Sequence, residues 1–303
     1  MGFKLLANPT LDKPIMIASW PGIGNIGLIA VDSLRKALDA EELGEVDAWE
    51  FFHPRGISIR EGKLEDVTFP RSRFFYKRTE KRDLILFVGE EQPSDTGAGY
   101  ASGHSAYRLA NLVLDVAQRF NCPRVFTSGA AVARTHHTMV PRVWAVPNSA
   151  ALLSEVRTYE NTVVMSQVEG RRGQGKIAGL NGLLLGVARK RGVEAVCIMG
   201  EIPIYLQGLP LTYPKASLAV VEVLRAALGL AVEMRELRLL VDRGEREVES
   251  LYQRFPAEIR AQLDRLKQVA HPRQNQTGPI TEEDKKQILE EIDRFFKREK
   301  NGE

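Results

Sequence analysis

Three glycines with the spacing G-x-G-x-x-G stand between an apolar run and an amphipathic segment near the start of the chain. They are Gly22, Gly24 and Gly27 in the stretch SWPGIGNIG. Glycine has no Cβ atom, so it adopts positive φ easily and lets another backbone or a ligand approach closely. From 26 to 38, apolar residues recur at three- and four-residue steps, and Asn25 is a suitable N-cap. The pattern predicts a strand, a tight glycine loop and a helix in succession.

A loop of this kind can bind a dinucleotide, because backbone N–H groups and the dipole at a helix N-terminus attract a pyrophosphate. The dinucleotide fingerprint places its first glycine directly after the strand, whereas Trp20 and Pro21 intervene here. An acidic residue should also end the second strand, but Asp47 and Glu50 stand at the start and in the middle of the run from 46 to 52. We therefore interpret the glycines as structural, and keep a nucleoside- or nucleotide-binding enzyme as the alternative.

The middle of the chain alternates short apolar runs with amphipathic segments. The apolar runs predict strands at Leu84–Val88, Arg124–Thr127 and Ala195–Met199. The amphipathic segments predict helices at Ser102–Phe120, with Tyr107 on its apolar face, Gly179–Arg191 and Pro214–Leu228. Strands and helices that alternate in this way form βαβ units, in which helices cover parallel strands. We predict an α/β fold with a mostly parallel sheet and helices on both faces.

The ends of the predicted strands carry glycines and, in two cases, glutamates. Glycine follows the strands at Gly22, Gly89, Gly129 and Gly200. Glu90, Glu91 and Glu201 come directly after two of these glycines. The carboxyl ends of parallel strands lie along one edge of the sheet, where ligands or partners are received, so we expect these glutamates to gather there. Two carboxylates in a cleft can serve as acid and base, but we favour a role in which each glutamate accepts hydrogen bonds from backbone N–H groups.

Four stretches carry a resemblance to a known family. They are WPGIGNIG at 20–27, LFVGEEQP at 86–93, GLNGLLLG at 179–186 and MGEIPIY at 199–205. In content and order they resemble the family of proteasome assembly chaperone two and its prokaryotic relatives. The resemblance implies an α/β body related in shape to nucleoside phosphorylases, in proteins that oligomerise and bind other proteins, and it supplies no catalytic residues. The candidate ligand or partner edge consists of Trp20, Pro21, Gly22, Gly24, Asn25, Gly27, Glu90, Glu91, Asn181, Glu201 and Pro203.

The segment from His53 to Arg82 is basic although the net charge of the chain is only +3. It contains nine Lys or Arg residues against four acidic residues, interleaved with aromatic side chains. Basic and aromatic side chains together are typical of surfaces that bind single-stranded nucleic acid. Charges at the ends of the predicted strand Arg73–Arg78 are also typical of an edge strand that avoids pairing with other molecules. We favour the edge strand over a nucleic-acid partner.

Two further motifs match catalytic patterns incompletely. Gly170–Lys176 has the spacing of a phosphate loop, but Ile177 replaces the Ser or Thr that would hold Mg²⁺. We interpret it as a basic glycine loop before a helix. Gly103–Tyr107 is similar to a nucleophile elbow, but Tyr107 replaces the final glycine, so the stretch predicts the first turn of a helix.

The histidines and cysteines do not predict a metal site or a disulfide. The five histidines lack the spacings of tight metal sites, so we expect no metal, and His136 and His137 lie in a polar stretch where we expect them to be solvated. Cys122 and Cys197 stand beside or within predicted strands and are expected in the core. The sequence shows neither a long apolar run nor a signal peptide, so we predict a cytoplasmic protein with no membrane partner.

Composition changes towards the C-terminus. Residues 233–303 contain fifteen basic and sixteen acidic residues in 71 positions, which predicts a charged helical extension on an α/β body that spans 1–232. Pro256 should end one helix of this extension. A last helix has an apolar face that includes Phe295 and Phe296, and we expect it to pack within a homo-oligomer.

Together these features predict an oligomeric, non-catalytic protein-binding factor that resembles proteasome assembly chaperones and needs no cofactor. Its expected partners are a client protein and further copies of itself. In the family it resembles, docking uses a C-terminal apolar residue followed by tyrosine. Lys300–Glu303 contains neither of these residues, so we expect the client to contact the body of the chain.

Overall fold

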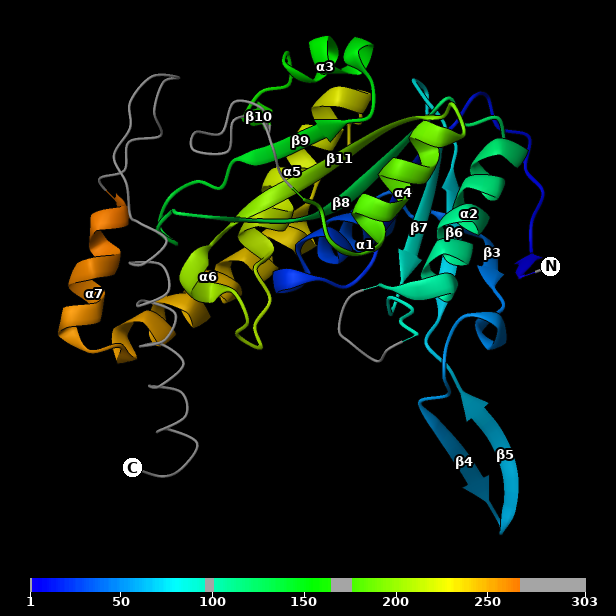
Figure 1. Cartoon of the computed structure of the whole chain (residues 1–303), viewed down its shortest axis with the longest axis horizontal. Helices are drawn as coiled ribbons and strands as arrows, with labels where there is room; N and C mark the ends of the chain where they lie inside the picture. The colour runs from blue at the N-terminus through cyan, green and yellow to red at the C-terminus, as the bar shows by residue number, and fades with distance from the viewer. Residues whose placement is uncertain (1, 96–100, 165–175, 268–303) are drawn as a thin grey trace.

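The computed structural model describes residues 2–95, 101–164 and 176–267. Within these residues, nine strands form one sheet between layers of helices, and two more strands form a separate hairpin (Figure 1). Across the main sheet the strands are, in order, β1 (Phe3–Leu5), β3 (Glu41–Val46), β6 (Ser72–Lys77), β7 (Leu84–Gly89), β2 (Ile15–Ser19), β8 (Arg124–Ala133), β11 (Glu194–Pro203), β9 (Val143–Pro147) and β10 (Thr162–Val164). The hairpin consists of β4 (Gly56–Arg60) and β5 (Lys63–Thr68).

The centre of the main sheet is parallel and most of its flanking pairs are antiparallel. Strands β7, β2, β8 and β11 run parallel to one another. On one side β6, β3 and β1 are added antiparallel, and on the other side β9 is antiparallel to β11 and parallel to β10. The α/β class is confirmed, but the mostly parallel arrangement holds only for the centre. Short connections such as the one from β6 to β7 allow antiparallel pairing, whereas parallel neighbours need a long crossover.

The prediction of an exposed edge strand at Arg73–Arg78 is wrong. The corresponding strand β6 lies between β3 and β7, and its Phe74 and Phe75 are buried. Its Arg73 pairs with Glu42 of β3 at 3.3 Å, and its Lys77 donates to the backbone carbonyl oxygen of Asp39 at 3.1 Å. The basic side chains of this interior strand therefore make contacts within the protein.

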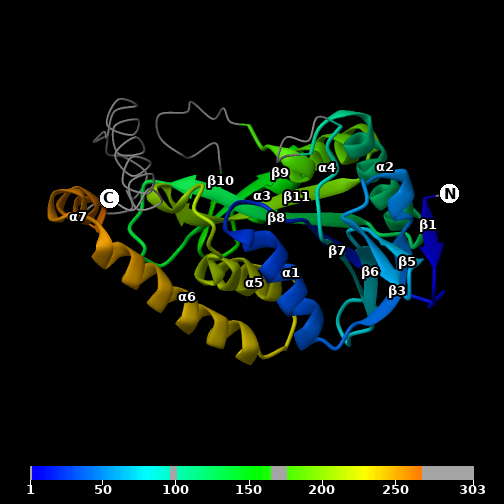
Figure 2. The same ribbon diagram turned by 90° about the horizontal axis from the view of Figure 1, so that it is seen from below.

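Helices cover both faces of the sheet, as predicted. One face is covered by α1 (Ile26–Ala37) and α5 (Pro214–Leu228), and the other by α2 (Gly103–Arg119) and α4 (Gly179–Lys190). In Figure 2 these two layers lie below and above the sheet, with α6 (Arg235–Arg254) under α5. The remaining helices are α3 (Ala150–Val156), which contacts β9, and α7 (Ala257–Asp264).

Some details of the predicted elements differ. Gly129 and Gly200 lie inside β8 and β11, not after them, because these two strands pair with each other over ten residues. Tyr107 is 46% exposed on α2, although the periodicity placed it on the inner face. Gly103 begins α2, which confirms that the Gly103–Tyr107 stretch is the first turn of a helix. Cys122 and Cys197 are buried and unpaired, and burial raises the pKa of the Cys197 thiol to about 11.

The first part of the C-terminal extension packs on the body. Leu237, Val248 and Tyr252 of α6 are buried in the same core as α1 and α5. Helix α6 ends two residues before Pro256, as predicted. The predicted last helix and the loop Gly170–Lys176, apart from Lys176 itself, lie outside the described residues. Among the helices that the structure does describe, none has the length and apolar character needed to span a bilayer.

Candidate functional site

The glycine loop joins β2 to α1 through a short 3₁₀ turn at Ile23–Asn25. Gly24 has φ +61° and Asn25 has φ +48°, so two consecutive residues adopt the left-handed conformation. Asn25 occupies the N-cap position, but its side chain makes no capping hydrogen bond. The carbonyl oxygen of Gly24 instead accepts a 2.8 Å hydrogen bond from the N–H of Tyr213. This contact fixes the loop to the segment that begins α5.

Gly27 packs the first turn of α1 against β8. A Cβ atom at this position would overlap the carbonyl oxygen of Ser128 and lie 2.5 Å from its carbon. The same carbonyl oxygen accepts hydrogen bonds from Ser19 Oγ at 3.1 Å and from Asn181 Nδ2 at 2.9 Å. Strand β2, strand β8 and the start of α4 therefore meet at one backbone oxygen, and only glycine leaves room for α1 beside it.

Gln92 is a central residue of the site that was not among the predicted edge residues, although it lies in the motif at 86–93. Its Nε2 donates to the carbonyl oxygen of Pro21 at 2.6 Å, and its Oε1 accepts from the N–H of Leu180 at 3.0 Å and of Ala101 at 3.3 Å. One side chain thus links the glycine loop, the loop before α2 and the first turn of α4. Because its partners are 71 and 88 residues away along the chain, local sequence carries no signal for this role.

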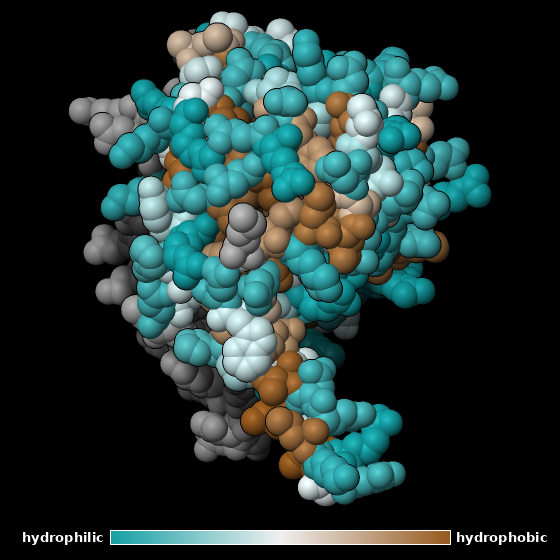
Figure 3. All heavy atoms as spheres, turned by 90° about the vertical axis from the view of Figure 1, so that its right-hand side faces the viewer, coloured by the Kyte–Doolittle hydropathy of each residue, from teal (hydrophilic) through white to brown (hydrophobic). Residues whose placement is uncertain are grey.

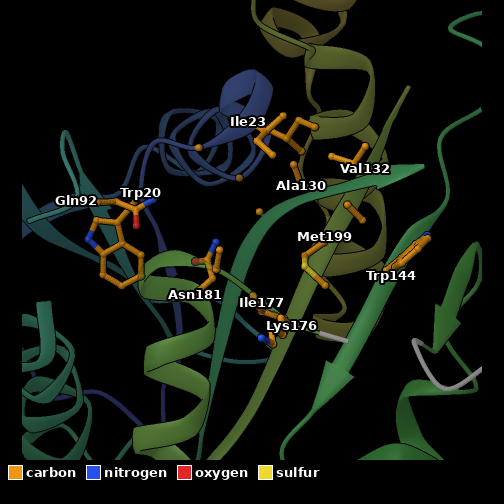
Figure 4. A pocket seen from close by; sticks show the side chains of 16 residues that line it. Trp20, Ile23, Gln92, Ala130, Val132, Trp144, Lys176, Ile177, Asn181 and Met199 are labelled. Carbon is orange, nitrogen blue, oxygen red and sulfur yellow. The ribbon is translucent and has the colours of Figure 1, made fainter. Parts of the chain in front are cut away.

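A cavity of about 230 Å³ lies at this junction, along the carboxyl edge of the parallel strands. Trp20 and Trp144 stand at opposite sides of it, with Asn181 and Met199 between them (Figure 4). Of the predicted edge residues, the cavity brings together Trp20, Gly22, Gly27 and Asn181. Lys176 is the one ionisable side chain among the described lining residues, so they offer no acid–base pair.

Two polar atoms at the cavity have no hydrogen-bond partner within the described part of the chain. They are Trp20 Nε1, on a residue that is 2% exposed, and Asn181 Oδ1. Trp20 Nε1 faces the backbone of Gly89, where a Cβ atom would lie 2.8 Å from it. This indole packs at 5.1 Å on the ring of Phe87, so its position is determined by the core.

The predicted glutamates do not form one group. Glu90 and Glu91 both pair with Arg55 at the base of the β4–β5 hairpin, at 3.3 and 3.0 Å. Glu90 also accepts a hydrogen bond from the N–H of Arg71, as expected of a glutamate that satisfies backbone groups. Their side chains are more than 40% exposed, so these ion pairs add little to stability.

Glu201 lies separately, inside β11, and is 1% exposed. Its carboxylate accepts hydrogen bonds from Arg142 Nε and Nη2 at 3.0 and 2.8 Å, from the N–H of Arg142 at 3.1 Å and from Trp144 Nε1 at 2.7 Å. These four donors compensate for the loss of water around the buried charge. Glu201 therefore holds Trp144 at the wall of the cavity instead of facing the other glutamates.

The remaining predicted edge residues lie around a second hollow and in the core. Pro21, Gly24 and Asn25 line a hollow of about 500 Å³ together with residues 207–212. Pro203 is buried at the end of β11, opposite Ala133 of β8. The predicted edge is therefore divided between two hollows, an ion-pair cluster at the hairpin base, and buried positions in β11.

His136 and His137 are buried, so the prediction that they are solvated is wrong. Their exposed fractions are 1% and 6%, because α6 and α7 cover the loop that carries them. The N–H of His137 donates to Tyr205 Oη at 2.8 Å, and its Nε2 lies 3.0 Å from Glu249 of α6. Burial, and secondarily the neighbouring His137, lowers the pKa of His136 to about 4, and burial also lowers the pKa of His137. Across the described residues, no cluster of His, Cys, Asp and Glu has the arrangement of a metal site.

The folded chain is similar to proteins of one family. The crystal structure of PbaB from Pyrococcus furiosus, described as an archaeal proteasome activator, matches with a TM-score of 0.68 and 26% identity, over 82% of this chain and 97% of that chain. A proteasome-assembly chaperone homologue from Mycobacterium tuberculosis matches with a TM-score of 0.63 and 22% identity, over 82% of this chain and 99% of its own.

Sequence comparison agrees with these structures. An uncharacterized protein from Methanocaldococcus jannaschii is 24% identical over 242 residues, which are 80% of this chain and 84% of the relative. The profile of the PAC2 family matches residues 16–252. This match confirms the resemblance that the four sequence motifs predicted, and the chain belongs to the PAC2 family.

Proposed function

We propose that this chain is an oligomeric, non-catalytic protein-binding factor that acts on proteasome subunits. The observation that carries the proposal is the match to PbaB, since an archaeal proteasome activator shares 26% of its residues with this chain over nearly its whole length. Membership of the PAC2 family supports the same function.

The chemistry of the candidate site supports a binding role over catalysis. Gln92 and Glu201 direct their polar atoms at backbone and side-chain groups of the protein itself. They join loops and strands, so they serve to hold the carboxyl edge in one shape. Apolar side chains are exposed elsewhere, at Trp49 and on the β4–β5 hairpin, where a protein partner can cover them.

Several finer assignments belong to the proposal. The predicted edge residues, from Trp20 to Pro203, would form part of a partner surface, and the division of the chain near residue 232 would separate a body from its extension. A shape related to nucleoside phosphorylases is supported by the parallel centre of the sheet with helices on both faces. Two unpaired buried thiols support a cytoplasmic location.

The test is native mass spectrometry of the purified chain, alone and mixed with the α and β subunits of the 20S core particle from the same organism. We expect a homo-oligomer alone, a complex with the subunits when mixed, and a change in the rate of core-particle assembly. A chain that binds neither the free subunits nor the assembled particle at micromolar concentration would refute the proposal. Turnover of a nucleoside or nucleotide by the same sample would instead identify an enzyme.

A further inference from the structure

The β4–β5 hairpin projects from the body and pairs with no other described strand (Figure 1). Its two strands are antiparallel, with Ile57 opposite Val67 and Ile59 opposite Leu64. Residues directly opposite each other in such a ladder have their side chains on the same face. These four apolar side chains therefore share one face of the hairpin.

This apolar face is open to solvent. Ile57, Ile59 and Leu64 are 65%, 71% and 66% exposed, and hydrophobic side chains run along the projecting arm in Figure 3. At the base of the arm, exposed Trp49 packs against Phe69 with tilted rings whose centroids are 4.5 Å apart. A two-stranded hairpin is marginally stable by itself in water, and stability requires additional strands or a packing partner. The arm thus has the properties of a segment that is completed by another molecule.

The two outer edges of the hairpin differ in their protection against further pairing. Strand β5 carries Lys63, Glu65 and Asp66, and its pairing with β4 is irregular between Ser58 and Ile59. Charges and bulges of this kind are how edge strands avoid pairing with other chains. Strand β4 has no proline, and its one charged residue, Arg60, lies at its end beside the turn and pairs with Glu65 of β5. Its outer edge is therefore the one that is open to another strand.

We propose that β4 pairs antiparallel with β4 of a second copy of this chain, which forms a four-stranded sheet in the order β5–β4–β4–β5. This inference rests on the homo-oligomer in the proposed function and specifies its interface. A two-fold axis perpendicular to the sheet at Ser58 places Ile57 of each copy opposite Ile59 of the other. The two apolar faces then join on the same side of one sheet, which has enough strands to be stable.

Charge favours a second copy as the occupant. From 55 to 68 the hairpin segment carries three basic and three acidic residues, so it does not select a strongly charged partner. In the pairing centred on Ser58, Arg60 of each copy stands opposite Gly56 of the other, so no like charges face each other within the paired strands. A surface of balanced charge that pairs across a two-fold axis is self-complementary.

The register is tested with a cysteine at the two-fold axis. In Ser58→Cys the Cα atoms of the two new cysteines would be about 4.5–5.5 Å apart, within the range that a disulfide spans. We expect most of this variant to form a covalent dimer under mild oxidation, as seen on a non-reducing gel. Lys63→Cys on β5 is the matched control and should remain uncrosslinked. Cys122 and Cys197 are buried and do not compete.

The interface itself is tested with Ile59→Lys, which puts a charge into the proposed β4–β4 pairing. Light scattering should show that the mass of the oligomer falls by half, whereas Leu239→Lys on α6, a site that is 59% exposed, should leave the mass unchanged. Equal crosslinking of the two cysteine variants, a monomeric wild-type chain, or an unchanged mass for Ile59→Lys would each overturn the proposal. Because no readout involves proteasome subunits, a failure of client binding is distinguishable from a failure of this interface.

Discussion

Replacing Gly27 by alanine should destabilise the fold by about 2–4 kcal/mol. The added methyl group would enter the space occupied by the carbonyl group of Ser128, which is backbone and cannot rotate away. Overpacking of a well-packed interior costs roughly 1–3 kcal/mol. Displacing this carbonyl would also weaken the hydrogen bonds from Ser19 and Asn181, each worth about 1 kcal/mol. The higher helix propensity of alanine offsets at most about 1 kcal/mol.

The measurement is urea unfolding followed by circular dichroism, at one fixed protein concentration because oligomerisation contributes to stability. Gly186→Ala is the matched control, since Gly186 lies inside α4 and a Cβ atom there would meet nothing within 4 Å. The control should be as stable as the wild type or gain up to about 1 kcal/mol. If Gly27→Ala unfolds at the same urea concentration as this control, the close approach of α1 to β8 does not matter and our account of the loop is wrong.

Two further predictions concern buried ionisable groups. Glu201→Leu leaves Arg142 without its partner and should cost about 3 kcal/mol in urea unfolding, whereas adding Arg142→Met should restore part of the loss; equal stability of the single and double variants would contradict this. For His136 and His137, the folded pKa lies below the unfolded value near 6.5, so the unfolded chain binds more protons as pH falls. The free energy of unfolding should be constant above about pH 6.5 and fall towards pH 4, and this fall should be shallower in His136→Phe. Parallel pH profiles of the wild type and the variant would contradict this role of His136.

Local sequence was sufficient for the elements that are amphipathic and have clear boundaries. The helix predicted at Pro214–Leu228 has the same bounds as α5, because proline favours its first turn and Gly229, with φ +66°, ends it. Strand lengths were less predictable. The apolar run predicted that the last central strand ends at Met199, whereas β11 continues to Pro203. It passes through Glu201 because Arg142 compensates the charge of this glutamate. A donor 59 residues away along the chain cannot be inferred from the sequence around the glutamate.

The residues that sequence reasoning missed depend on contacts between distant parts of the chain. His137 is buried because Glu249 and the rest of α6 reach it from 112 residues away. Gln92 looks like an ordinary loop residue until the glycine loop and α4 are folded against it. The three glutamates were expected together because all follow apolar runs, but their partners lie on different elements, at Arg55 and at Arg142. The spacing of residues in the sequence predicts which of them lie along the carboxyl edge of the sheet. Where each side chain lies depends on its ion-pair or hydrogen-bond partner, which is distant in the sequence.

The glycine loop shows why a near match to the dinucleotide fingerprint arises without the nucleotide function. In that fingerprint the third glycine allows the helix to pack closely on the sheet. Gly27 has this packing role against Ser128, so the same spacing follows from the same geometry. The first glycine differs, because Gly22 is extended at φ −167° and follows Pro21, whose carbonyl group is held by Gln92. The carbonyl oxygen of Gly24 likewise accepts a hydrogen bond from the N–H of Tyr213. The backbone of this loop is therefore fixed by the protein itself, and the pattern reflects helix packing more directly than phosphate binding.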